Sequence, residues 1–246
     1  MKKARNVLAL TLAVVLTAGA LSACGGKTSS TPESSATAAA GGSESAAPAA
    51  GGESARDTLR VALTSEPPNL STCDHDSLIS VGMNMLTFNG LVRIDNATLK
   101  PELDLASDYK VENDVDWIFT LKQGVKFHNG DDFTAADVVA TLEYAKSLPA
   151  TTTYTSNMKS IEAVDDFTVK ITTNEPYAGL LYDLGYHFNW ILPKGLIESG
   201  NDFNENPVGT GPYKLVEWVS GDHLTFEAFD DYFDAERKAK IKNLEF

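Results

Sequence analysis

The chain contains 246 residues, of which 43% are hydrophobic, and it carries a formal net charge of −14 at pH 7. A surface this acidic keeps a protein soluble and repels both nucleic acid and anionic lipid. The composition therefore argues against nucleic-acid binding, and no basic patch with interleaved aromatic residues is present in the sequence.

The first 24 residues predict an export signal. Three basic residues, Lys2, Lys3 and Arg5, precede an uncharged apolar run over 7–20 that is too short for a comfortable transmembrane span. The Leu-Ser-Ala-Cys sequence that follows resembles a bacterial lipobox, which implies cleavage before Cys24 and acylation of that residue. Acyl chains on Cys24 would anchor the protein stably to a membrane. The alternative is an ordinary signal peptide in which Cys24 is incidental.

Residues 25–57 predict a disordered tether. They include no Val, Ile, Leu, Met, Phe, Tyr or Trp, so they cannot bury enough apolar surface to offset the entropy lost on ordering. A flexible coil of this length spans roughly 30 Å root-mean-square. A tether next to a lipobox is typical of a Gram-positive surface lipoprotein.

The folded part begins with a predicted strand over 58–63, where apolar and polar residues alternate. Pro67 and Pro68 end this strand, because proline has no backbone N–H to donate to a ladder. A short helix is predicted over 77–86 and a strand over 89–94.

The clearest local signals lie between Trp117 and Lys146. Strands are predicted over 117–121 and 125–127, and Asn129–Gly130 predicts a tight turn because both residue types tolerate positive φ. The aromatic side chains of this stretch are expected in the core and not at a ligand; they are Trp117, Phe119, Phe127 and Phe133.

A helix is predicted to begin after this turn. Thr134 and Asp137 have the spacing of a capping box, and the helix should end before Pro149. One apolar stripe recurs at helical spacing and predicts the buried face; it consists of Val138, Leu142 and Ala145.

Further along, residues 161–171 predict a hairpin around the Asp165-Asp166 turn. The remaining predicted elements are helices over 176–184 and from Pro193, strands over 213–219 and 223–229, and a final strand from 241 to 246.

Two ordered patterns resemble the extracellular solute-binding proteins, family 5, that serve peptide-type ABC importers. The first is Trp-x-Phe-x-Leu, then GVKFHNG and FTAADVVATL, over 117–142, and the second is Val-Gly-Thr-Gly-Pro-Tyr over 208–213. The resemblance implies an α/β fold, namely the first lobe of a type II periplasmic binding protein. Such a lobe is a mixed sheet flanked by helices, with an inserted α/β subdomain.

The resemblance also implies a division of the chain. It assigns 58–100 and 161–246 to the first lobe and 101–160 to the insertion. Family members cross into a second lobe after this point, so we expect an N-terminal fragment that lacks the second lobe. Half a cleft should bind solute weakly, and an unpaired final strand should promote aggregation.

Ligand-facing residues are implied by the same resemblance. The loop after the first strand contributes Ser65, Glu66, Pro67 and Asn69, and the later turn and strand end contribute Thr210, Gly211 and Tyr232. The competing interpretation is a surface loop with an Asx-type turn and a purely structural glycine turn. The family continues its loop with Leu-Asp-Pro, whereas this chain has Leu-Ser-Thr over 70–72.

Catalytic and metal signatures are absent from the sequence. The four histidines, His75, His128, His187 and His223, lack metal-ligand spacing, and no HExxH, CxxC or GxSxG motif occurs. Cys73 lacks a paired base and is expected to be a bystander. We therefore expect no enzyme activity, no cofactor and no metal.

The combined prediction is a monomeric, lipid-anchored receptor that captures a peptide or similar small solute and delivers it to an ABC permease. Nickel complexes and oligosaccharides stay open as solutes. The alternative is a surface lipoprotein that acts in signalling or adhesion without transport. A hydrolase of cell-wall peptides is disfavoured because no nucleophile–base set is visible.

Overall fold

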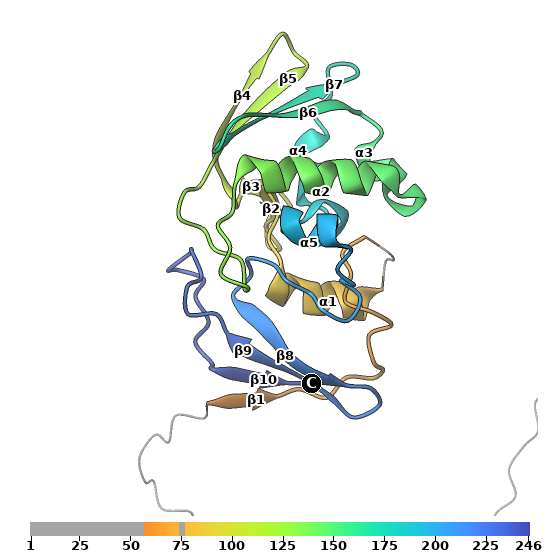
Figure 1. The fold of residues 1–246 in the computed structure, drawn as a ribbon, viewed down its shortest axis with the longest axis vertical. Coiled ribbons are helices and arrows are strands. Elements are labelled where there is room, and N and C mark those ends of the chain that lie inside the picture. Colours follow the sequence, from red (N-terminus) through yellow and green to blue (C-terminus); the bar gives the residue numbers. More distant parts are fainter. Residues whose placement is uncertain (1–56, 74–76) are drawn as a thin grey trace, which may run out of the picture. The chain divides into compact units, whose positions relative to one another are not determined.

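The structure, a computed structural model, describes residues 57–73 and 77–246 (Figure 1). The predicted signal, Cys24, the tether up to residue 56 and His75 lie outside the described residues. The helices are α1 (Leu78–Thr87), α2 (Ala135–Ser147), α3 (Thr152–Thr155), α4 (Leu180–Gly185) and α5 (Lys194–Ser199), with 3₁₀ turns at Pro149–Thr151 and His187–Asn189. The strands are β1 (Thr58–Arg60), β2 (Val92–Ile94), β3 (Pro101–Leu103), β4 (Ala106–Glu112), β5 (Asp116–Leu121), β6 (Met158–Asp165), β7 (Thr168–Thr173), β8 (Tyr213–Val219), β9 (His223–Ala228) and β10 (Asn243–Glu245).

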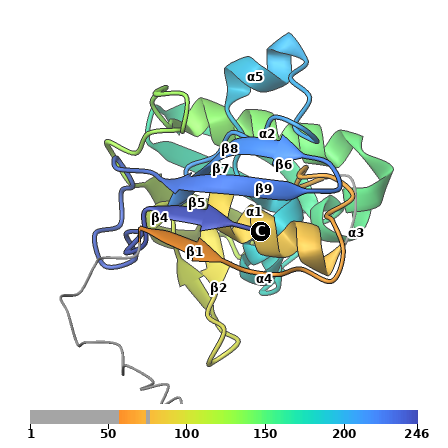
Figure 2. The same ribbon diagram turned by 90° about the horizontal axis from the view of Figure 1, so that it is seen from below.

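One sheet is built from the two ends of the described chain, in the order β1-β10-β9-β8 (Figure 2). β10 runs parallel to β1 and antiparallel to β9, with Leu244 opposite both Leu59 and Phe226. Helix α1 covers one face, where Leu70 and Met83 pack with the sheet residues Phe226 and Leu244. The expectation of an unpaired final strand is therefore wrong, because β10 is paired on both sides.

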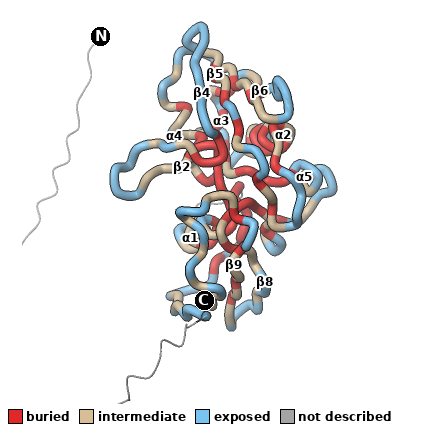
Figure 3. Tube along the Cα trace, turned by 90° about the vertical axis from the view of Figure 1, so that its left-hand side faces the viewer, coloured by how far each residue is buried: buried red, intermediate tan, exposed pale blue. Residues whose placement is uncertain are grey.

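A second sheet has the order β4-β5-β7-β6, and the hairpin β2–β3 lies beside it. α2 packs against β6 and β7, and α4 packs against β2. The buried interior in Figure 3 includes the predicted stripe of α2 and the four aromatic side chains of the Trp117–Phe133 stretch. The predicted boundary between residues 160 and 161 falls inside β6, whose residue Ile161 is paired with Ile171 of β7.

Local signals around α2 are confirmed with one exception. The backbone N–H of Thr134 donates to Asp137 Oδ2 at 2.8 Å, as a capping box requires, and α2 ends at Ser147. Residues 125–127 do not form a strand, since only Lys126 makes a single bridge to Asp132. Gly124 and Gly130 both adopt positive φ, so the chain turns twice within a few residues and has no room for a ladder.

Helix α1 buries a polar face that its apolar pattern did not predict. Ser77 caps the helix as expected, but Leu78 is 87% exposed while Ser80 and Asn84 are buried. Ser80 Oγ donates to the Asn69 carbonyl at 2.6 Å, and Asn84 Nδ2 donates to the Ser71 carbonyl at 2.9 Å. These bonds hold the loop that follows β1 against the helix.

A buried histidine joins the two sheets. Nε2 of His128 bonds to the Gly211 carbonyl at 2.9 Å, and Nδ1 accepts from the Gly209 N–H at 3.4 Å. This pattern requires the neutral ring with its proton on Nε2. Burial lowers the pKa of His128 to about 4. The ring therefore stays neutral well below its ordinary titration range.

The glycine turn that receives this histidine also touches the end of α1. A Cβ on Gly211 would lie 2.3 Å from the Leu86 carbonyl oxygen, and one on Gly209 would lie 2.1 Å from the Thr87 carbonyl oxygen. Both neighbours are backbone atoms, which cannot rotate away. The two glycines are thus needed for close approach of two main chains.

We expect His128 to dominate the change in stability between pH 6.5 and pH 4. The unfolded chain protonates this ring near pH 6.5 and the folded chain only near pH 4, so stability is full above pH 6.5 and is lost on acidification, by about 3 kcal/mol in total. Urea unfolding of His128→Gln should show a flatter pH slope there. His223→Gln is the control, because Asp222 and Glu217 raise the pKa of that exposed ring and both states are protonated in this window. Equal slopes for both variants would contradict the assignment.

Gly211→Ala should lower the free energy of unfolding by about 2–3 kcal/mol, because its Cβ would overlap the backbone of α1. Gly195→Ala in α5 is the matched control, since a Cβ there meets no atom within 4 Å. That variant should be neutral or slightly more stable, as alanine is the better helix former. Urea denaturation with an unchanged m-value measures both, and a Gly211→Ala protein as stable as wild type would refute the close-approach assignment.

Candidate functional site

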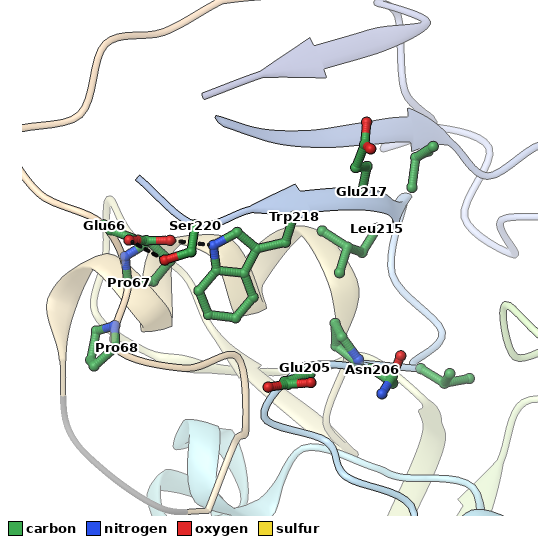
Figure 4. Close-up of a pocket in the computed structure, with 12 residues that line it drawn as sticks. Glu66, Pro67, Pro68, Glu205, Asn206, Leu215, Glu217, Trp218 and Ser220 are labelled. Atoms are coloured by element: carbon green, nitrogen blue, oxygen red, sulfur yellow. Dashed lines mark hydrogen bonds between the residues drawn. The ribbon is translucent and has the colours of Figure 1, made fainter. Parts of the chain in front are cut away.

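The loop after β1 is fastened to the β8–β9 hairpin by Glu66 (Figure 4). Oε1 accepts from Trp218 Nε1 at 2.6 Å, and Oε2 accepts from Ser220 Oγ and from the Gly221 N–H, both at 3.1 Å. These hydrogen bonds, that from Trp218 first, hold the pKa of the exposed Glu66 carboxyl below its usual value. Both carboxylate oxygens are therefore engaged within the chain.

An open groove of about 850 Å³ lies beside this contact, and we call it the β8 groove. Figure 4 shows Trp218 and Leu215 extending from β8 toward the segment that carries Glu205 and Asn206. The lining residues are Glu66, Pro67, Pro68, Glu205, Asn206, Pro207, Val208, Leu215, Val216, Glu217, Trp218 and Ser220.

The other two predicted loop residues are placed differently. Ser65 lines a smaller pocket of about 340 Å³ with Asp222, His223 and Phe246. Asn69 Oδ1 accepts from the Ser71 N–H at 3.1 Å, which is the Asx-type turn of the competing interpretation. Direct contact of Ser65, Glu66, Pro67 and Asn69 with a solute stays a prediction.

The later group of predicted residues converges on a buried amide. Thr210 is fully buried, and its Oγ1 donates to Asn89 Oδ1 at 3.1 Å. Asn89 Nδ2 donates to Asp104 Oδ2 at 2.7 Å and lies 3.5 Å from the hydroxyl oxygen of Tyr232. Burial raises the pKa of Tyr232, so its hydroxyl stays protonated. Gly211 is occupied by the α1 contact described above.

Asp104 is a buried carboxylate with a cationic partner. Its Oδ1 pairs with Arg237 Nη2, and Arg237 Nε also donates to Asp234 Oδ2 at 2.7 Å. The hydrogen bond from Arg237 lowers the pKa of Asp234. Because a buried charge is costly without a partner, Arg237 is needed to keep Asp104 ionised inside the protein.

A cavity of about 260 Å³ borders this network, and we call it the Asn89 cavity. Its wall combines the acidic Asp104, the basic Arg93 and Arg237, and the indole of Trp190. Arg93 pairs with Glu102 in the neighbouring strand β3. Charges of both signs beside an aromatic surface suit a small zwitterion, because each end of such a molecule finds an opposite charge.

The two groups of predicted residues lie at opposite ends of α1. Ser80 contacts the loop of Asn69 and Thr87 contacts the turn of Gly211, and these helix positions are about 10 Å apart along the axis. Asn89, Asp104 and Arg237 were not singled out from the sequence. The Asn89–Gly90 pair marked the start of a predicted strand, but the Asp104–Arg237 pair joins residues 133 positions apart and leaves no local pattern.

The other sequence candidates have structural surroundings. Cys73 is buried with Sγ 3.6 Å from the Phe188 carbonyl, and His187 Nδ1 lies 3.1 Å from the Thr72 carbonyl. Asp131 and Asp165 accept hydrogen bonds inside their own turns. Within residues 57–73 and 77–246, no group of three His, Cys, Asp or Glu side chains is arranged to hold a metal ion. In the same residues, no helix has the length and apolar character needed to cross a membrane.

Comparison with known proteins agrees with this architecture. The chain is 34% identical over 186 residues to the glutathione-binding protein GsiB of Salmonella paratyphi A, covering 73% of this chain and 36% of that protein. The chain thus spans about a third of the length of this curated relative. Among solved structures, AgaA of A. tumefacien R10 in complex with agropinic acid has a TM-score of 0.71 at 30% identity, covering 77% of this chain and 39% of AgaA. AppA of Bacillus subtilis in complex with a nonapeptide has a TM-score of 0.68 at 27% identity, covering 76% and 39%.

These matches confirm the expected fold, part of a type II periplasmic binding protein with mixed sheets and flanking helices. The profile described as "Bacterial extracellular solute-binding proteins, family 5 Middle" matches residues 100–246. The chain therefore belongs to family 5 of the bacterial extracellular solute-binding proteins.

Proposed function

We propose that this protein captures a peptide or a similar small, charged solute outside the membrane and delivers it to an ABC permease. Family membership carries this proposal, since related chains bind glutathione, agropinic acid or a nonapeptide. These solutes differ in size and all carry ionised groups, which favours a site able to meet charge of either sign. The protein binds as a monomer and performs no reaction on the solute.

The Asn89 cavity is the proposed contact surface for the solute. Arg93 and Arg237 face a carboxylate, Asp104 faces an ammonium group, and Trp190 gives an apolar wall. Thr210 and Tyr232 act as positioning residues, because both hydrogen-bond to the Asn89 side chain and not to open space. The predicted ligand role of this later group is therefore assigned to fixing the cavity wall.

Solute binding is tested with the full chain and a panel of glutathione, a tripeptide and a nonapeptide, by saturation-transfer NMR, which detects millimolar binding. We expect at least one to bind, and Arg93→Gln to weaken it about tenfold through loss of a charged hydrogen bond. Arg60→Gln is the control, because Arg60 is exposed, pairs with Glu245 and lies outside the Asn89 cavity. Binding that is equal in both variants, or absent across the panel, would contradict the proposal.

We also propose that acylation of Cys24 anchors the protein at the cell surface, with residues 25–57 as the spacer. The Leu-Ser-Ala-Cys sequence supports this. Cells fed an alkynyl fatty acid should label the wild-type protein and retain it in the membrane fraction. Cys24→Ser should lose the label and change fraction, whereas Cys73→Ser should keep both properties. Label on Cys24→Ser would overturn the assignment.

A further inference from the structure

We propose that the β8 groove docks an extended, basic, internal segment of a partner protein, which adds to the sheet beside β8. This site is separate from the Asn89 cavity and goes beyond solute capture. The proposal depends on an edge strand, an apolar wall and the sign of the charges in the groove, and the following paragraphs take these in turn.

The first observation is that β8 ends its sheet. The order β1-β10-β9-β8 leaves its outer side without a neighbouring strand among the described residues. Four consecutive β8 residues, Leu215–Trp218, line the groove. An edge strand presents backbone N–H and C=O groups on which an extended segment can pair. The groove is therefore placed where a strand can be added.

The register of β8 limits how far such pairing can extend. Leu215 is opposite Phe226 and Glu217 is opposite Thr225, so Val216 forms a bulge and its side chain is 59% exposed. A bulge bends an edge and shortens the straight stretch available to a new strand. Pairing alone would therefore be weak, and side chains must supply the selectivity.

Opposite β8, the groove is walled by Pro67, Pro68 and Pro207. Proline has no N–H, so this wall cannot pair with the occupant as a second strand. It offers apolar surface instead, facing the Trp218 and Leu215 side chains. An occupant can thus pair on one side and place apolar side chains against the other.

The charges in the groove have one sign. Glu66, Glu205 and Glu217 are its three ionisable residues, and no Lys, Arg or His lines it. Glu66 is engaged by Trp218 and Ser220, and Glu217 Oε2 lies 3.4 Å from His223 Nε2. Glu205 is exposed at the groove. With a net charge of −14 for the whole chain, electrostatic attraction favours a basic occupant.

The same charges decide between a free peptide and part of a protein. A free peptide in the groove would place its terminal carboxylate among glutamates, where no cation receives it. An internal segment carries no terminal carboxylate. The occupant is therefore a segment within a longer chain, with Lys or Arg alternating with apolar residues.

The test uses the full chain and a fluorescent hexapeptide that is acetylated and amidated, with valine alternating with arginine or lysine. Fluorescence anisotropy at low salt should detect binding below about 1 mM. The double variant Glu205→Gln with Glu217→Gln should weaken it five- to tenfold, because two rim charges are lost. The control is Glu198→Gln with Glu236→Gln, the same charge change outside the groove. Equal weakening in both double variants would show unspecific attraction and overturn the proposal.

Backbone pairing is tested on the peptide and not on the protein. Two versions carry N-methyl groups on alternate residues, one set on odd and one on even positions. Only one set removes the N–H groups that face β8, so one version should lose at least tenfold in affinity relative to the other. Equal affinities would refute strand addition. A version with a free carboxylate should bind more weakly, and tighter binding of that version would identify a free peptide as the occupant and refute the internal segment.

The outcome is separable from that of the proposed solute site. Arg93→Gln lies outside the β8 groove and should leave hexapeptide binding unchanged. A loss of hexapeptide binding in that variant would mean that the peptide occupies the Asn89 cavity, and the docking proposal would then be wrong. Solute binding without hexapeptide binding would refute only the docking site.

Discussion

The close contact between the end of α1 and the Gly209–Gly211 turn is the constraint on which the rest of the structure depends. The Gly211 N–H donates to the Thr87 carbonyl at 2.8 Å, and the missing side chains let two backbones meet. On the far side of the turn, His128 bonds to both glycines. One turn therefore joins α1 and the β8–β9 hairpin to the stretch before α2, and any displacement of it would move both sheets.

The polar network next to this turn has a different physical character. Asn89 contacts three partners, and its charged neighbour Asp104 is only 2% exposed. In a low dielectric, such a network is rigid while every member is satisfied and costly when one partner is removed. This rigidity fits a binding wall, because side chains that are already ordered lose little entropy when a ligand arrives. The Glu66 contact is exposed, so solvent screens it and it fastens a loop without fixing an interior.

Local patterns in the sequence predicted most of the elements, while tertiary pairing decided the rest. The capping box at Thr134 and the turn at Gly130 depend on neighbours in the chain, so their signals survive without the fold. The buried face of α1 does not, because Ser80 and Asn84 are inside only where the loop of Asn69 and Ser71 offers carbonyl oxygens. No periodicity of apolar residues contains that information.

Long-range pairing limited the candidate site in the same way. Thr210 and Tyr232 were reached through a resemblance, yet their common partner Asn89 is more than one hundred positions away from both. The final strand gave no sign that it would insert between β1 and β9. A strand sequence specifies its two faces but not its neighbours, and so the edge of this sheet moved from β10 to β1 and β8.

That position of the edge has a consequence for how one lobe can serve two kinds of partner. α1 separates the Asn89 cavity from the loop of Glu66, and the two regions differ in charge: the cavity combines both signs, while the β8 groove is acidic throughout. A zwitterionic solute gains from paired opposite charges and is poorly matched to a groove of glutamates. A basic strand gains from those glutamates and is repelled by Arg93 and Arg237. Discrimination between the two occupants then follows from charge placement at fixed sites, with no change in the fold.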